Sequence, residues 1–149
     1  MKNPFEGIEF EAMLLGRYLS PTHKNPEGGH YLDRSAYTLL TRLQLEGPMS
    51  ISQLSEAFGL DASTLNRQTA AMLREGLVER IPDPDGGLAR KFTVTDAGRQ
   101  RLASDRRTKV NGLRQVLEDW SDEDVSTLSA LLRRFNTDIE RRDGRPWPR

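Results

Sequence analysis

The sequence contains no cysteine. This absence excludes disulfide bonds, thiol redox sensing, cysteine nucleophiles and zinc sites built from thiolates. An excess of charge of one sign is also absent, because 22 lysine and arginine residues balance 22 aspartate and glutamate residues. The balance excludes a uniformly basic nucleic-acid coat and an acidic disordered tail. Any charge that binds DNA must therefore be confined to one face of the molecule.

Long apolar runs are missing as well. No run approaches the roughly 18 residues that suggest a membrane span, and residues 1–11 lack the apolar centre of a signal peptide. We therefore expect a soluble, cytoplasmic protein with no membrane partner. The length of 149 residues corresponds to about one domain. A hydrophobic content of 36% beside 30% charged residues is typical of long amphipathic helices.

Residues that carry catalysis are few. The only histidines are His23 and His30, which lie in or beside a loop rich in proline and glycine. The sequence has no H-x-x-x-H, no glycine loop that would cradle a phosphate and no G-x-S-x-G. Asp83 and Asp85 occupy a turn that explains them without chemistry. The sequence therefore predicts no enzymatic activity and no cofactor or metal site.

Apolar residues recur at helical spacing near both ends of the chain. Residues 5–19 predict a helix with two apolar stripes, formed by Phe5, Ile8, Ala12, Leu15 and Leu19 and by Phe10, Leu14 and Tyr18. The last predicted helix has a narrow stripe of Val125, Leu128, Leu132, Phe135 and Ile139. Such a stripe is typical of a coiled-coil seam, and the two features together predict a subunit interface. Residues 141–149 are expected to fray.

Five residues predict the starts of helices. Asp33, Asp61, Thr95 and Ser121 are expected N-caps, and Ser50 forms a capping box with Gln53. The helices that begin after Ser50 and Asp61 are short and are separated by Gly59, which indicates a tight turn.

A hairpin is expected after these two helices. Residues 77–80 and 91–94 predict two strands joined by a turn at 82–87. Helix, turn, helix and a two-stranded hairpin together make a winged helix-turn-helix arrangement.

The second short helix carries a face suited to a DNA groove. Ser63, Thr64, Arg67 and Arg74 lie opposite its apolar side, and residues 61–71 contain neither lysine nor glutamate. An ordinary solvated helix favours those two residue types, so this composition indicates DNA binding. We predict that Arg67 pairs with a guanine edge and that Ser63 and Thr64 reach bases or phosphates.

Other residues are predicted to hold the DNA backbone or the minor groove: Ser50, Ser52, Arg74, Arg90 and Lys91. Free N–H groups at the start of the first short helix favour an anion beside the two serines. For Ser50 alone, simple capping explains the residue equally well. For Lys91, an ordinary surface charge is an equal alternative to a phosphate contact.

Several short segments, in their order and spacing, resemble the MarR family of transcriptional regulators. They are Leu-Asp-Ala-Ser-Thr-Leu at 60–65, Gly-Leu-Val-Glu-Arg at 76–80, Asp-Pro-Asp at 83–85 and Thr-Asp-Ala-Gly at 95–98. The resemblance covers essentially the whole chain. It implies a homodimer joined by its terminal helices, two winged helix-turn-helix lobes, and repression that small aromatic or phenolic ligands often relieve. The family wing commonly carries Asp-x-Arg at its tip, whereas this chain has Gly86-Gly87-Leu88 there.

The expected fold is therefore mainly α with a small β-hairpin wing. A winged helix-turn-helix DNA-binding region is predicted at 33–95, with a helical dimerisation region at 1–32 and 96–149, in one continuous fold. The expected function is that of a dimeric, sequence-specific transcriptional regulator, a repressor released by a small organic ligand. Its expected partners are double-stranded DNA with an inverted-repeat operator and a second copy of the chain. The alternative is a winged-helix module for protein–protein contact without specific DNA binding. His30 and Tyr37 are the candidate ligand-binding residues.

Overall fold

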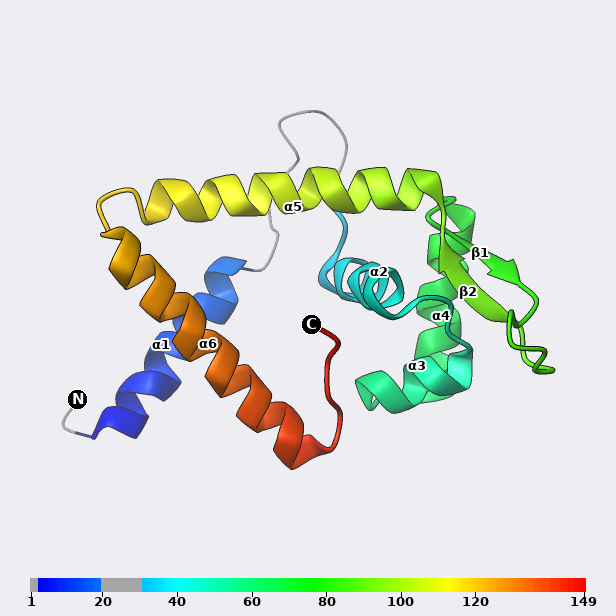
Figure 1. Ribbon diagram of the computed structural model, residues 1–149, viewed down its shortest axis with the longest axis horizontal. Coiled ribbons are helices and arrows are strands. Elements are labelled where there is room, and N and C mark those ends of the chain that lie inside the picture. Colours follow the sequence, from blue (N-terminus) through cyan, green and yellow to red (C-terminus); the bar gives the residue numbers. More distant parts are fainter. Residues whose placement is uncertain (1–2, 20–30) are drawn as a thin grey trace.

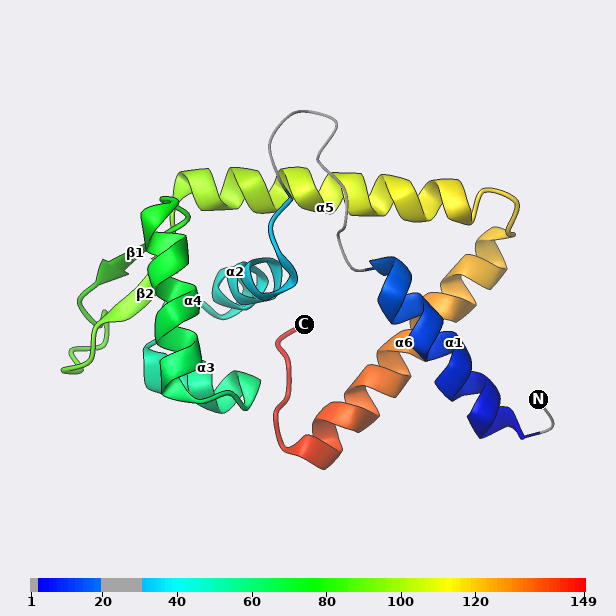
Figure 2. The same ribbon diagram turned by 180° about the vertical axis from the view of Figure 1, so that it is seen from behind.

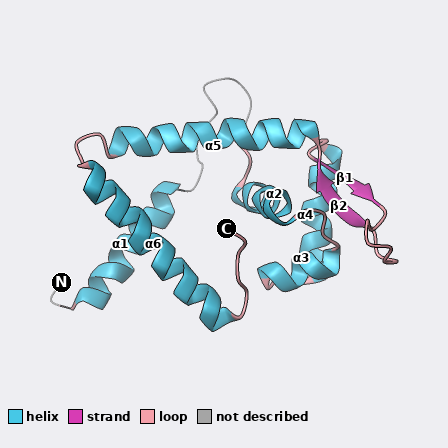
Figure 3. Cartoon of the chain, viewed as in Figure 1, coloured by secondary structure: helices cyan, strands magenta, loops and turns pink. Residues whose placement is uncertain are grey.

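The computed structural model describes residues 3–19 and 31–149, which form helices and one two-stranded antiparallel sheet (Figure 3). In chain order the elements are α1 (Pro4–Leu19), α2 (Arg34–Glu46), α3 (Ile51–Phe58), α4 (Ala62–Arg74), β1 (Val78–Ile81), β2 (Lys91–Val94), α5 (Asp96–Val116) and α6 (Asp122–Asp143). The expected mainly helical fold with a hairpin wing is confirmed.

Each helix after α1 begins at an N-cap whose side chain accepts a hydrogen bond from the backbone N–H three residues later. The caps of α2 to α6 are Asp33, Ser50, Asp61, Thr95 and Ser121. These are the five predicted residues, and the capping box of Ser50 is also present. Because a cap satisfies a free N–H group at the helix start, these side chains fix where each helix begins.

The hydrophobic core joins α2, α3, α4, the hairpin and the first half of α5. Leu40, Leu54 and Leu65 have no exposed surface, and Leu102 contributes from α5. The hairpin is held to this core through Phe92, and the strands pair in a register that sets Val78 opposite Val94. The backbones of Phe92 and Met49 also exchange two hydrogen bonds, of 2.8 and 3.2 Å. The wing and the start of α3 are therefore held in one unit.

The start of α5 lies very close to the chain before the hairpin. A Cβ atom on Gly98 would stand 2.1 Å from the carbonyl oxygen of Leu77, so only glycine fits there. Two turns later, the carboxylate of Asp105 is fully buried and accepts a hydrogen bond of 2.7 Å from the backbone N–H of Leu32. Arg101 lies 3.6 Å from the second oxygen of this carboxylate. The segment that enters α2 is thus fastened to α5.

Beyond Asp105 the described chain has no further buried residue. α5 continues as a long helix away from the core, and α1 and α6 lie near its far end, opposite the hairpin (Figure 1). The view from behind shows the same separation between the winged-helix part and the terminal helices (Figure 2). No helix within the described ranges is long and apolar enough to span a membrane.

The expectation that residues 141–149 fray is wrong. Residues 141–143 complete α6, and Gly144 ends that helix in the left-handed conformation with a φ of 67°. The following residues turn back toward α2 and α3, where the ring of Trp147 packs on Phe58 (Figure 1). The tail is ordered by contacts with residues far away in sequence, which local composition does not reveal.

Candidate nucleic-acid interface

The helices α3 and α4 are held together by a short turn and by buried leucines. Gly59 ends α3 in the left-handed conformation with a φ of 64°, and its N–H donates to the carbonyl oxygen of Ser55. α4 begins at Ala62, only three residues after Gly59, and the buried Leu54 and Leu65 belong to the core beneath the two helices. A rigid pair of this kind presents the outer face of its second helix at a fixed angle, as DNA-reading helices require.

The N-terminus of α4 contains a small hydrogen-bond network. The carboxylate of Asp61 accepts hydrogen bonds from the backbone N–H of Thr64 (2.7 Å) and from the hydroxyl of Ser63 (2.8 Å). These bonds, first those from Thr64 and then that from Ser63, lower the pKa of Asp61 to about 2. The carboxylate therefore stays ionised near neutral pH. A DNA contact by Ser63 must use its remaining acceptor capacity or replace the bond to Asp61.

The outer face of α4 carries the predicted reading residues. Ser63, Arg67 and Arg74 are all exposed, and their spacings of four and seven residues place them on one side of the helix. Thr64 is half-buried beside them. Sequence reasoning overlooked Asn66, which is exposed next to Arg67 and has the side chain that pairs best with an adenine edge. Its position directly before Arg67, on the predicted second helix, was the signal in the sequence that could have identified it as a candidate for DNA contact.

The two serines at the start of α3 differ in accessibility. Ser50 is 7% exposed, and its hydroxyl oxygen accepts the capping hydrogen bond from the N–H of Gln53. Ser52 is exposed in the first turn. A phosphate contact by either serine stays a prediction, and the geometry leaves Ser52 the freer of the two.

The wing is stabilised by a turn centred on Asp83. Its carboxylate accepts a hydrogen bond of 2.9 Å from the N–H of Asp85, and Gly86 follows with a φ of 84°. The ammonium group of Lys91 lies 3.3 Å from the same carboxylate, and both side chains are nearly buried. These partners lower the pKa of Asp83, the bond from Asp85 being the largest cause. Lys91 is thus engaged within the wing, whereas Arg90 is exposed.

Two further basic residues flank the hairpin. The guanidinium of Arg80 lies 5.4 Å from the ring centroid of Phe92. Arg99, in the first turn of α5, donates a hydrogen bond of 3.0 Å to the carbonyl oxygen of Val94. The first contact joins paired positions of β1 and β2, and the second joins α5 to the end of β2 five residues earlier.

The two predicted ligand-binding residues have different outcomes. His30 lies outside the described residues. Tyr37, on α2, is half-buried and meets two cations of α5. The ammonium of Lys109 stands 4.8 Å from the ring centroid, and Nε of Arg106 is 3.4 Å from the hydroxyl. Among the described residues, no group of three or more acidic, cysteine or histidine side chains could hold a metal ion.

Comparisons with known proteins bear on the family and the fold. Residues 32–86 match the model of the MarR family. The HTH-type transcriptional regulator YxaD of Bacillus subtilis (strain 168) is 37% identical over 138 residues, which cover 91% of this chain and 94% of that protein. A second regulator of that organism, YybA, is 26% identical and covers 74% of this chain and 73% of its own length. The structure of a MarR family protein from Bacillus stearothermophilus matches with a TM-score of 0.69 and 22% identity, covering 93% of this chain and 99% of that one. That structural likeness shows the fold.

The ion pair inside the wing leads to a test. Replacing Lys91 with methionine leaves the Asp83 carboxylate without its cation, so we expect faster amide hydrogen exchange at Asp85 and Gly86. Replacing the exposed Arg90 with glutamine is the matched control and should leave these rates unchanged. Equal exchange in both variants and in the wild type would show that the pair does not stabilise the wing.

Proposed function

The chain belongs to the MarR family, and we propose that it is a homodimeric repressor that binds an inverted-repeat operator and is released by a small organic ligand. Like its relatives, it is a DNA-binding transcriptional regulator. It is not an enzyme. The observation that carries the proposal is the exposed face of α4 around Arg67, held rigidly by α3 and flanked by the wing. The alternative of a protein–protein module has no observation in its favour.

Exposed apolar residues on the terminal helices support the homodimer. They include Phe5, Ile8, Phe10, Met13, Leu15, Tyr18 and Leu19 on α1, Val110, Leu113 and Val116 on α5, and Val125, Leu131, Leu132, Phe135 and Ile139 on α6. Phe5 is 76% exposed and Val116 is 77% exposed. A monomer in water rarely leaves so many large apolar side chains uncovered along three helices. A second copy carries the same surface, and a two-fold axis would bring the two surfaces together.

We expect the wild-type protein to sediment as a dimer at micromolar concentration. A glutamate in place of Leu132 puts a charge into the predicted seam and should convert the protein into a folded monomer. A glutamate in place of Leu45, an apolar residue of α2 that is 52% exposed outside this surface, is the matched control and should leave the dimer intact. A wild-type protein that sediments as a stable, folded monomer would rule out the homodimer.

Two α4 helices in such a dimer would read two half-sites. Two-fold symmetry predicts an inverted repeat with half-site centres about 10 base pairs apart, or a multiple of this. Arg67 is proposed to read a base, with Ser63 and Thr64 beside it. Ser50, Ser52 and Arg74 are proposed to contact the backbone. The exposed Arg90 suits an A·T-rich minor groove. A contact of Lys91 with neighbouring phosphates would require its side chain to leave Asp83.

Replacing Arg67 with alanine should weaken operator binding by about 1–3 kcal/mol and relax the base preference at one position in each half-site. Replacing Arg74 with alanine is the comparison. If Arg74 holds a phosphate, its loss should weaken binding to all sequences alike and reduce the salt slope by about one. Both variants are measured by titration against operators that differ at single positions. A uniform loss for the Arg67 variant would assign this residue to the backbone instead.

The surroundings of Tyr37 support a site for an anionic aromatic effector. A tyrosine ring, a lysine and an arginine meet where α2 of the winged helix passes α5. Arg106 also lies 3.4 Å from the hydroxyl of Thr41 on α2. The cations would attract a carboxylate or phenolate, and the ring would pack on an aromatic group. A ligand that prefers the form unable to bind DNA must lower operator affinity.

Screening small aromatic acids by thermal shift and by operator release tests this site. A compound that releases the wild-type protein should lose its effect when Lys109 is replaced by methionine, while operator affinity without the compound stays the same. The same change at the exposed Arg107 is the control and should preserve release. If compounds raise the melting temperature but never alter operator affinity, ligand regulation is refuted.

A further inference from the structure

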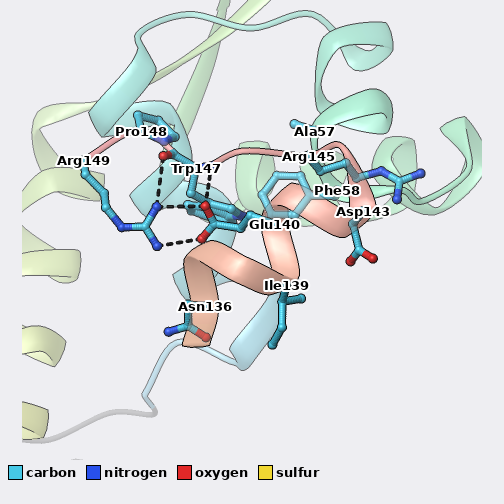
Figure 4. Close-up of a pocket in the computed structure, with 10 residues that line it drawn as sticks. All are labelled: Ala57, Phe58, Asn136, Ile139, Glu140, Asp143, Arg145, Trp147, Pro148 and Arg149. Atoms are coloured by element: carbon cyan, nitrogen blue, oxygen red, sulfur yellow. Dashed lines mark hydrogen bonds and ion pairs between the residues drawn. The ribbon is translucent and has the colours of Figure 1, made fainter. Parts of the chain in front are cut away.

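Residues 144–149, here called the strap, join the end of α6 to the winged helix-turn-helix part. The strap lies across the end of α3, with Trp147 beside Phe58 of α3 and Arg149 directed toward Glu140 of α6 (Figure 4). Nε of Arg145 donates a hydrogen bond of 3.2 Å to the carbonyl oxygen of Glu56. A Cβ atom on Gly59 would stand 2.8 Å from the guanidinium carbon of Arg145, so this side chain covers the turn between α3 and α4. A cation at the C-terminal end of a helix is also electrostatically favourable.

Trp147 fixes the strap to two helices of the core region. Its ring meets Phe58 of α3 edge-to-face, with centroids 5.6 Å apart and an angle of 82°. The guanidinium of Arg42, on α2, lies 5.0 Å from the centroid of the Trp147 ring and pairs with Glu46 at 2.6 Å. Edge-to-face and cation–π contacts are both favourable and direction-dependent, so they define one position for the indole.

The last residue of the strap returns to α6. The guanidinium of Arg149 donates to both carboxylate oxygens of Glu140, at 2.6 and 2.8 Å, and the backbone N–H of Trp147 donates to one of them at 3.2 Å (Figure 4). A two-pronged pair of this kind fixes orientation as well as distance. It also lowers the pKa of Glu140 to about 2, so the carboxylate remains charged near neutral pH. The strap is thus held at α6, at α3 and at α2.

The strap occupies a place where α6 and the core region do not pack closely. A cavity of about 530 Å³ lies between α3, α6 and the strap, and its lining includes Ala57, Asn136 and Ile139 (Figure 4). On α2, beside the Trp147 ring, one nitrogen of the Arg42 guanidinium, Nη1, is buried with no hydrogen-bond partner in the part of the chain that the structure describes. Undocking the indole would give this nitrogen access to water. The favourable contacts of the docked indole are therefore opposed by the free-energy cost of keeping this nitrogen away from water.

We propose that the strap sets the orientation of α3 and α4 relative to α6, and thereby determines which half-site spacing the dimer recognises. The inference rests on the proposed dimeric, operator-binding function. If the seam of α6 joins the two chains, the position of each α3–α4 pair in the dimer depends on the segments that connect this pair to its own α6. Within residues 3–19 and 31–149, those connections are α5, which extends far beyond the core, and the strap. Trp147, Arg149 and Glu140 are thus positioning residues that act on α4 through α3.

The test measures operator affinity against half-site spacing. A set of otherwise identical operators has its spacing changed by one or two base pairs in either direction, and unrelated DNA reports non-specific binding. The variants are Trp147→Ala, Arg149→Gln, Glu140→Gln and the exchanged pair Glu140→Arg with Arg149→Glu. Arg141→Gln is the matched control, because Arg141 pairs with Asp138 at 3.1 Å on the same helix without touching the strap. Amide exchange at Trp147 reports whether the strap is docked.

We expect the three single variants to speed exchange of the backbone amide at position 147 and to lose about tenfold in affinity for the best spacing. Neighbouring spacings should then bind about as well as the best one, while the dimer and non-specific binding stay unchanged. The exchanged pair should restore part of the spacing preference, and the control should retain all of it.

Several results would overturn the proposal. Fast exchange at Trp147 in the wild type would show that the strap is not docked. An undocked strap with an unchanged spacing profile would show that it positions nothing. An equal loss on all DNA, together with a lower melting temperature, would make it a stabilising segment only. Absence of any sequence preference in the wild type would instead refute the operator-binding function itself.

Discussion

The carboxylate of Asp105 accepts a hydrogen bond from the backbone of Leu32 at the point where burial on α5 ends. On one side of this point, α5 shares a core with α2, α3, α4 and the hairpin. On the other side, the same helix continues with exposed apolar residues and leads to α6. One chain therefore completes one core and carries a second apolar surface that it cannot cover. The winged-helix part depends on the shared core, and the proposed dimer depends on the uncovered apolar surface.

Helix caps link this core to the proposed DNA-reading face of α4. Asp61 begins α4 so soon after Gly59 ends α3 that the two helices have little freedom relative to each other. The Asp61 carboxylate, however, already binds the hydroxyl of Ser63. The group that begins the helix thus competes with DNA for one of the proposed reading residues. Arg67, one turn further along, has no such constraint from capping and is exposed.

The strap is a second connection between the core and α6. α5 joins the core to α6 covalently, and the contacts of Trp147 and Arg149 join them again without a covalent link. An α3–α4 pair that is connected to α6 both through α5 and through the strap has a better defined orientation than a pair connected through α5 alone. The unpaired nitrogen of Arg42 lies beside the docked indole, and a buried, unpaired donor opposes docking.

Caps, strands and apolar stripes could be predicted from the sequence because each depends on residues a few positions apart. Asp33, Ser50, Asp61, Thr95 and Ser121 each act on a backbone group three residues away, and the face of α4 follows from helical spacing. Three tertiary contacts could not be predicted in this way: those of Lys91 with Asp83, of Lys109 with Tyr37 and of Trp147 with Phe58. The sequence by itself determined the elements and the exposed face around Arg67. Only the tertiary structure decided that the tail docks and that Lys91 is engaged within the wing, because these contacts depend on how the folded elements meet in space.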